Sequence, residues 1–296
     1  MLTKLRSRKS PKLLKPQNSA WRIFRQNKAA VVALAYIVAV FLFCYVGPRF
    51  YHSNQTDAFE GLFFTNMPPQ AGFPLGTDDQ GYDILGRIMY GGQTSLEVGM
   101  LSAVVAMTWG ALYGLISGYR GGAFDAVMMR IVDALLSIPG LFLLLALMSI
   151  FNRSELLLVL VLGGTGWYGV ARLTRSESLA LRNREYVSAV RSMGGSSTRI
   201  IRRHILPNSV STLITVTTFT IGDSILALSA LGFLQLGVPL PKTDWGTMLN
   251  TGIQSIQLNY WWKVYPVATV FLLLVVSFNY VGDALRDVFE VRLRTQ

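Results

Sequence analysis

The sequence predicts an all-α membrane protein with about six transmembrane helices. Of its 296 residues, 51% are hydrophobic and only 15% are charged, whereas a soluble domain carries about 25% charged residues. The apolar residues form long runs, and a helix that spans a bilayer needs about 20 of them. The net charge of +11 comes from Lys and Arg that lie between the runs, which favours control of membrane topology over nucleic-acid binding.

The first apolar run covers residues 29–45. It follows a basic segment, 1–28, which contains nine Lys and Arg and no acid. No small-residue cleavage site follows the run, so we interpret it as a retained membrane anchor. The one cysteine, Cys44, lies in this run, and we expect it to be a small buried side chain because no metal-ligand partner is suitably spaced.

The second apolar run covers residues 96–116, after a polar stretch, 47–92, that is too long for a tight turn. Small residues recur at every fourth position of the run: Ser102, Ala106, Gly110, Gly114 and Gly118. This spacing places small side chains on one helix face, so we expect another helix to approach closely there.

The third and fourth runs cover residues 126–150 and 156–171. Pro139 lies inside the third run and is expected to kink it. Arg130 and Asp133 are three residues apart in the same run, and side chains at this spacing can face each other on a helix. We expect them to form a structural ion pair near the membrane interface.

The fifth run covers residues 210–236 and ends before Pro239, and the sixth covers 264–281. Asp223 lies within the fifth run, where a charge is costly and usually faces a bundle interior or a cavity. Asp223 would either line a solute path and meet a peptide amine, or satisfy a neighbouring helix.

Aromatic residues gather between the fifth and sixth runs, in the segment 238–262. They are Trp245, Tyr260, Trp261 and Trp262. Because Trp and Tyr are enriched where a membrane meets water, we expect an aromatic belt at this level.

The positive-inside rule orients the six runs. The segment 1–28 and the stretch 172–203, which has eight Arg against two Glu, are both expected in the cytoplasm. Four runs separate them, and this even number makes the two assignments agree. Both chain ends are then cytoplasmic and the loop 47–92 is external. The chain divides into the basic segment, a transmembrane domain (29–282) and a cytoplasmic tail (283–296).

The cytoplasmic loop 172–207 predicts a helix, a glycine turn and a second helix. A capping Asn can begin the first helix, two glycines can end it, Ser can cap the second, and Pro marks the return to the membrane. In order, these residues are Asn183, Gly194, Gly195, Ser196 or Ser197, and Pro207. We name the segment 185–197 the elbow.

The first helix of the elbow would place Tyr186, Val190 and Met193 on one face. An apolar face on an exposed, Arg-rich segment needs a partner, which suggests docking to a cytoplasmic protein. A basic loop that merely obeys the topology rule would have the same composition.

Six residues in and after the elbow form a spaced pattern: Ser188, Ala189, Val190, Gly194, Leu206 and Pro207. The pattern resembles the loop of permease subunits of ATP-binding cassette (ABC) importers, in which Glu-Ala-Ala is followed by Gly and then Leu-Pro. The lead-in to the pattern is similar to the peptide and nickel branch of that family. By this resemblance, the residues that couple to the ATPase are Glu185, Tyr186, Val187, Ala189, Val190, Gly194, Gly195, Leu206 and Pro207.

Three further segments resemble the same branch, and its C-type permease subunit in particular. They are 74–83, similar to an external PLGTDxxGRD motif, 129–139 and 282–287. Within 225–237 the chain departs from the family, because Leu228 replaces a frequent Glu and Gln235 replaces a Gly. The resemblance implies a binding-protein docking site at Gly76, Thr77, Asp78 and Asp83, and a translocation path that includes Asp223 and Leu228.

The resemblance implies a type I ABC importer permease fold in a bacterial or archaeal cytoplasmic membrane. The implied partners are a second homologous permease, two ATPase subunits, an extracytoplasmic binding protein and the lipid bilayer. The chain lacks the phosphate loop GxxxxGK[ST], so ATP and Mg would be held by the ATPases. We expect no catalytic residue, cofactor or metal site on the chain itself, since His52 and His204 have no second ligand nearby.

Other functions are possible on the sequence alone. The same machinery carries metal chelates or glutathione-like compounds in other members of the family. A secondary transporter would carry its own coupling-ion site and often inverted repeats, and no repeat is visible here. A membrane enzyme would need clustered acids, His or a nucleophile-base pair, and the acids of this chain are scattered.

Overall fold

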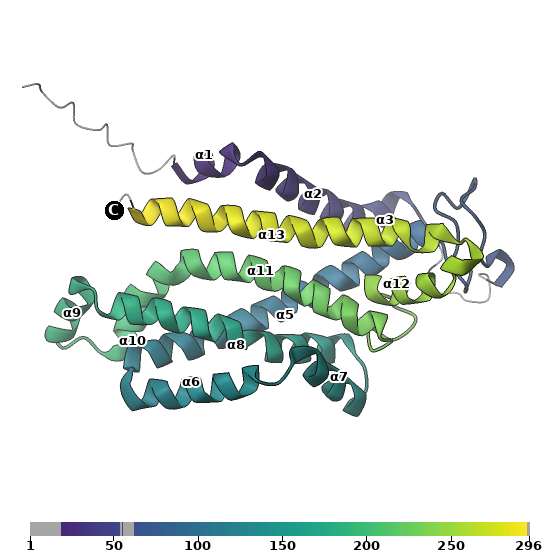
Figure 1. The fold of residues 1–296 in the computed structure, drawn as a ribbon. Helices are drawn as coiled ribbons and strands as arrows, with labels where there is room; N and C mark the ends of the chain where they lie inside the picture. The colour runs from purple at the N-terminus through teal and green to yellow at the C-terminus, as the bar shows by residue number, and fades with distance from the viewer. Residues whose placement is uncertain (1–18, 54, 56–61, 295–296) are drawn as a thin grey trace, which may run out of the picture.

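The computed structural model describes residues 19–53, 55 and 62–294, and this part of the chain is helical as predicted (Figure 1). The segment 1–18, which holds six of the nine basic residues used to predict the topology, lies outside the described residues. The elements are α1 (Ser19–Gln26), α2 (Lys28–Tyr45), α3 (Gly47–Phe50), η2 (Leu62–Phe64), α5 (Ile84–Arg120), α6 (Gly122–Leu136), α7 (Gly140–Ile150), α8 (Glu155–Arg182), α9 (Glu185–Ser192), α10 (Ser197–Ile200), η3 (Ile201–Ile205), α11 (Leu206–Phe233), α12 (Trp245–Gln254), η4 (Ile256–Leu258), η5 (Trp261–Lys263) and α13 (Tyr265–Arg294).

Five helices of the described chain are long and apolar enough to cross a membrane. They are α2, α5, α8, α13 and the continuous helix Ser197–Phe233, which joins α10, η3 and α11. The pair α6 and α7, bent by 78°, brings the number to six if it crosses as one span. Pro139 directly precedes α7, and a proline ring removes a backbone N–H and breaks the helix ladder. The predicted kink is therefore present as a complete break.

The helices extend beyond the apolar runs. The predicted run 96–116 is only the central part of α5, which begins after Asp83 because Oδ2 of Asp83 accepts a hydrogen bond from the Gly86 N–H at 2.8 Å. The described part of the predicted tail, 283–294, is likewise continuous with α13. There Ala284 and Val288 pack against α1 and α2. Hydropathy marks the part of a helix that lies in lipid, whereas capping groups and tertiary packing set its ends.

The small-residue stripe of α5 packs against α8, as predicted. A Cβ atom added to Gly110 would lie 2.6 Å from the Cβ of Val170, and one added to Gly118 would lie 2.5 Å from the carbonyl oxygen of Arg175. Such distances leave no room for a larger side chain. The close backbone approach maximises the van der Waals contact that holds helices together in lipid.

Ion pairs join α8 to the shorter helix α6. The Nε of Arg175 donates to Asp125 at 3.0 Å, and Asp133 pairs with Arg172 at 2.5 Å. The predicted pairing of Arg130 with Asp133 is therefore wrong. Arg130 and Asp133 have the right spacing within α6. However, Asp133 lies beside α8 and forms its ion pair with Arg172 of that helix.

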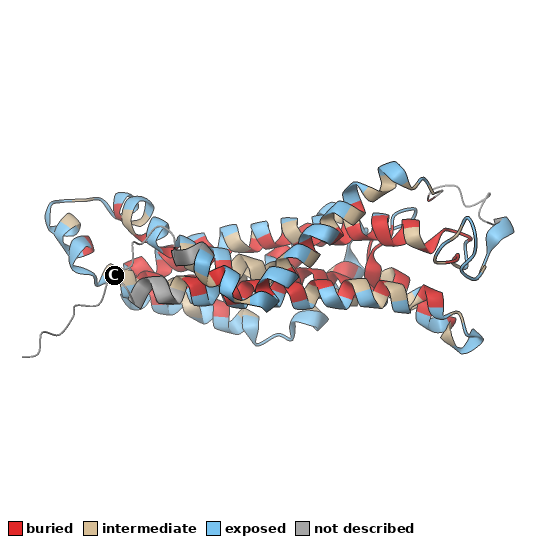
Figure 2. Cartoon of the chain, turned by 90° about the horizontal axis from the view of Figure 1, so that it is seen from above, coloured by how far each residue is buried: buried red, intermediate tan, exposed pale blue. Residues whose placement is uncertain are grey.

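The elbow and the external loop lie at opposite ends of the bundle. Figure 1 shows α9 and α10 at the same end as α1 and the end of α13, with α3 and α12 at the other end. Buried residues follow the inner faces of the helices, and exposed residues follow the outer faces (Figure 2).

We expect Gly163→Ala to destabilise the protein, because a Cβ there would lie 2.7 Å from the Cβ of Val105 on α5. The loss should be about 1 to 3 kcal/mol, typical of overpacking. Gly164→Ala, one residue further on, is the matched control, since its Cβ would meet no atom within 4 Å. Thermal unfolding in detergent measures both, and equal midpoints would contradict the close contact.

Candidate functional site: an exposed elbow and a cavity between the helices

The elbow lies between α8 and α11. Helix α8 ends at Arg182 with Asn183 as its C-cap, and α9 begins at Glu185 with Arg184 as its N-cap. The prediction that Asn183 caps the start of the elbow is wrong. Its backbone N–H donates to the carbonyl of Leu181, so Asn183 belongs to the end of the preceding helix.

An apolar cluster anchors the elbow to α5. Its buried members are Leu115, Tyr119, Val187, Ile200 and Ile205, with Val190 packed against them. The predicted apolar face through Tyr186, Val190 and Met193 is only partly correct, because Tyr186 is 41% exposed and Met193 is 79% exposed. Val187 and Val190, three residues apart, form the inward face instead.

The two glycines of the elbow are required for different reasons, one for its backbone conformation and the other for its close packing. Gly194 has φ of +79°, a left-handed conformation that favours glycine. A Cβ on Gly195 would lie 2.7 Å from Cγ1 of Val190, so this position is limited by packing. The Oγ of Ser196 then accepts a hydrogen bond from the Arg199 N–H at 3.4 Å and begins the second helix as predicted.

The second helix of the elbow continues into the membrane. α10 passes through the π-turn η3 into α11 without a break. Pro207 lies in the first turn of α11, where the wider π-turn accommodates its missing N–H. The elbow and α11 therefore form one mechanical element.

The outward surface of the elbow is exposed and basic. Six of the nine residues predicted to couple to an ATPase are exposed: Glu185, Tyr186, Ala189, Gly194, Leu206 and Pro207. The other three, Val187, Val190 and Gly195, are buried or half-buried and belong to the anchor. Exposed cations surround the six residues: Arg184, Arg191, Arg199, Arg202 and Arg203. Such a surface is complementary to an acidic groove.

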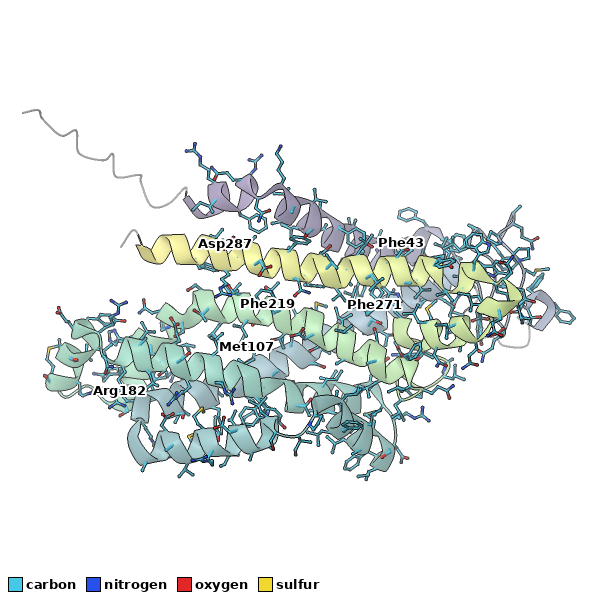
Figure 3. The ribbon with its side chains drawn as sticks, in the orientation of Figure 1. Phe43, Met107, Arg182, Phe219, Phe271 and Asp287 are labelled. Atoms are coloured by element: carbon cyan, nitrogen blue, oxygen red, sulfur yellow. The ribbon has the colours of Figure 1, made fainter. Side chains whose placement is uncertain are left out.

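A cavity of about 580 Å³ lies between α6, α7, α8 and α11. Its lining is mainly apolar and includes Phe219, which is labelled on α11 in Figure 3. Asp223, Thr165 and Thr220 supply polar groups. Asp223 is exposed to this space and forms no hydrogen bond or ion pair with any other described residue. The neighbouring-helix role considered for Asp223 therefore finds no partner within the described chain.

Leu228 does not reach the cavity. It is 0% exposed and packs with Val98, Leu158 and Leu231 in the core. The side of α11 that carries Leu228 faces α5 and α8, and a place for Leu228 in the translocation path stays a prediction.

The external motif is largely buried. The hydroxyl of Thr77 accepts a hydrogen bond from the Met67 N–H at 2.8 Å, and Asp83 caps α5. A Cβ on Gly76 would lie 2.5 Å from the carbonyl oxygen of Met67. Gly76, Thr77 and Asp83 therefore hold the loop together from inside, and docking of a binding protein at this motif stays a prediction.

Charged partners complete this external scaffold. Asp78 accepts hydrogen bonds from the N–H groups of Gln80 and Tyr82, both at 2.9 Å, and lies 3.6 Å from Arg87. Burial raises the pKa of Asp78, and Arg87 opposes that shift. Burial also raises the pKa of Asp83, and the hydrogen bond from the Gly86 N–H opposes that increase.

Sequence reasoning missed the link between this loop and η5. Lys263 is buried and pairs with Asp79, while the indole N–H of Trp262 donates to the carbonyl of Thr77 at 3.3 Å. Trp245 is fully buried as well. The predicted aromatic belt is wrong for Trp245 and Trp262, which fill the core of the external end. The local sequence contains no signal for the Lys263 pair, because its partner lies 184 residues away.

Long apolar helices, a cavity between them and an exposed segment next to one of them are features of a membrane transport subunit. The chain belongs to the family described as binding-protein-dependent transport system inner membrane component, whose sequence model matches residues 110–295. A second model, described as the N-terminal TM domain of oligopeptide transport permease C, matches residues 16–69. The protein is thus a multi-pass inner membrane protein.

Relatives match nearly the whole chain. The dipeptide transport system permease protein of Bacillus subtilis is 36% identical over 286 residues, which covers 97% of this chain and 88% of the relative. The oligopeptide transport system permease protein of Bacillus subtilis is 34% identical over 287 residues, covering 96% and 93%. The oligopeptide transport system permease protein of Escherichia coli is 34% identical over 289 residues, covering 96% and 95%.

We expect Val187→Ala to loosen the elbow, because it removes buried methyl groups that contact α5. The cost should be about 1 to 2 kcal/mol, which raises the hydrogen-exchange rates of the α9 amides. Ser188→Ala, on the exposed side of the same helix, is the matched control. Unchanged exchange in Val187→Ala would show that the apolar cluster does not hold the elbow.

Proposed function

We propose that this chain is the permease subunit of an ATP-driven peptide importer and forms half of its translocation pathway. Identities of 36% and 34% to a dipeptide and an oligopeptide permease, over nearly the full length of the chain, support this function. The observation that carries it is the exposed, basic elbow that continues into the helix bearing Asp223. A secondary transporter would have no use for such an elbow.

The elbow would be seated in a groove of a partner ATPase. Its exposed residues and five surrounding arginines provide the contact surface, and the apolar anchor provides the stiffness. Mg-bound ATP would be held by the ATPases, and its hydrolysis would displace the elbow. Both chain ends and the elbow would face the cytoplasm, which is supported by their common end of the bundle (Figure 1).

Displacement of the elbow would reach the cavity by two routes. The first is α11, which runs without a break from the elbow to Asp223. The second is the cluster of Val187 with Leu115 and Tyr119 on α5, because α5 packs against α8, which lines the cavity. A ligand-driven change of this kind stabilises one of two arrangements of the helices, here open to the inside or to the outside.

The remaining partners would be a second homologous permease, a second ATPase subunit and an extracytoplasmic binding protein. The cavity between α6, α7, α8 and α11 would be closed by the second permease. The binding protein would dock at the end that carries α3 and α12. There the motif around Thr77 and Asp83 supports the shape of the loop from inside.

Asp223 favours peptides over anionic chelates as the transported solute. An unpaired carboxylate in a mainly apolar cavity attracts a cation. A peptide supplies one as its terminal ammonium, whereas an anionic metal chelate would be repelled.

The proposed function is tested with the reconstituted four-subunit complex. We expect peptides together with the binding protein to stimulate ATP hydrolysis, and anionic metal chelates to stimulate it less. Stimulation by the non-peptide solutes alone would overturn the peptide assignment, and failure of any ATPase to co-purify would overturn the importer assignment.

We expect Gly194→Leu to uncouple ATP hydrolysis from uptake while leaving membrane insertion intact. The left-handed φ costs a side chain about 1 to 2 kcal/mol, and the new side chain projects into space that the ATPase would occupy, since no atom of this chain lies there. Gly72→Leu is the matched control, because Gly72 also has positive φ (+93°) and open surroundings but lies in the external loop. Normal uptake by a correctly inserted Gly194→Leu variant would refute the elbow assignment.

We expect Asp223→Asn to slow peptide uptake about tenfold or more, since a charge-assisted hydrogen bond contributes about 1.5 to 3 kcal/mol. Asp223→Glu, which keeps the charge, should retain most of the transport. Uptake of a peptide with an acetylated N-terminus should not respond to Asp223→Asn. Equal sensitivity of the free and acetylated peptides would rule out an ammonium contact at Asp223.

A further inference from the structure

A separate pocket of about 400 Å³ lies at the end of α5 opposite to the elbow. It is lined by the first turns of α5 together with the loop at Ser53 and Gln55 and the loop around Lys242. The proposed transport function does not use this pocket. Its chemistry points to a ligand.

Each cation of the pocket has an acidic partner, and only Lys242 remains open to a second one. Arg87 is buried, pairs with Asp78 at 3.6 Å and donates to the carbonyl of Pro241 at 3.1 Å. Lys242 pairs with Glu155 at 2.7 Å, although its side chain remains 60% exposed at the rim.

The acceptors of the pocket are not satisfied. Glu97 has no cationic partner among the described residues and accepts only a hydrogen bond from the Tyr45 hydroxyl, at 3.1 Å. The Oε1 of Gln55 also lacks a hydrogen-bond partner, but it is fully buried and closed to a ligand. A pocket with an unpaired carboxylate at its edge favours a ligand that carries a positive charge and donates hydrogen bonds.

The pocket continues into an exposed apolar stripe on α5. The exposed residues follow one another at helical spacing: Tyr90, Glu97, Leu101, Val104, Thr108 and Leu112. From Glu97 to Arg120, at the elbow end, α5 advances about 34 Å at 1.5 Å per residue, close to the hydrocarbon thickness of a bilayer at about 30 Å. Glu97 therefore lies at headgroup level, and Leu101 and Val104 lie beside the acyl chains.

The stripe faces away from the cavity that contains Asp223. Gly99 of α5 lies against Ile225 of α11, and Gly110 lies against Val170 of α8. Leu101 is two residues from Gly99, and Thr108 is two residues from Gly110. At about 100° of rotation per residue around the helix axis, each therefore lies about 200° from its contact, on the opposite side of α5. The pocket therefore lies outside the proposed peptide route.

We propose that this pocket binds the headgroup of a phospholipid that ends in a primary ammonium, the phosphatidylethanolamine class. The ammonium donates to the carboxylate of Glu97, and the phosphate lies near the exposed ammonium of Lys242. The acyl chains run along Leu101 and Val104. An anionic headgroup without an amine meets the unpaired carboxylate, and a trimethylated headgroup has no N–H to donate.

The test uses the assembled transporter in lipid-depleted detergent, titrated with phosphatidylethanolamine, phosphatidylcholine or phosphatidylglycerol and followed by native mass spectrometry. We expect phosphatidylethanolamine to bind most tightly, and Glu97→Gln to weaken that binding about tenfold and abolish the preference. Glu177→Gln, a half-exposed acid near the other end of the bundle, is the control and should leave both unchanged. Equal affinity for the three lipids, or an unaffected Glu97→Gln variant, would overturn the proposal.

A second measurement identifies what covers the stripe. A photo-reactive amino acid in place of Leu101 should cross-link to phospholipid in native membranes, and the mass of the adduct should be that of phosphatidylethanolamine. Cross-linking to the second permease instead would assign the stripe to a subunit interface and overturn the lipid site. Neither measurement depends on peptide uptake.

Discussion

Close packing of α5 against α8 positions the other parts of this subunit. In lipid an apolar side chain gains little by leaving the surrounding hydrocarbon, so helices associate through van der Waals contact between small residues. Gly110 and Gly118 permit that contact because nothing larger than hydrogen fits between them and α8. The same helix supplies Leu115 and Tyr119 to the anchor of the elbow and Glu97 to the pocket at its far end.

Ion pairs join the other elements to this packed pair of helices and to one another. Asp125 with Arg175 and Asp133 with Arg172 tie α6 to α8 near the elbow end. Lys263 with Asp79 ties η5 to the loop at the opposite end. Asp223 and Glu97 each line a pocket, and neither has a cationic partner within the described residues. Since an unpaired charge near lipid is costly, both are places where a ligand would supply the missing charge, and they lie on different sides of α5.

The elbow combines a stiff side with an open side. Val187 and Val190 hold its first helix against α5, and the helix that follows its glycine turn runs through a π-turn into α11 without a break. The outward surface, by contrast, contacts nothing in the described chain at Gly194. A segment built in this way can receive a push from outside and pass it to the helices that enclose the cavity.

The sequence by itself determined the six apolar segments, the break at Pro139, the small-residue face of α5 and the glycine turn of the elbow. These features depend on local composition and spacing, because lipid imposes the length of a helix and backbone geometry imposes glycine or proline. The resemblance of short motifs also identified the family. Only the tertiary structure decided which groups meet. Asp133 pairs with Arg172 rather than Arg130, and Leu228 lies in the core, because such contacts depend on which helix lies beside which. The partners come from helices that are distant in the sequence, so local residue spacing cannot predict them.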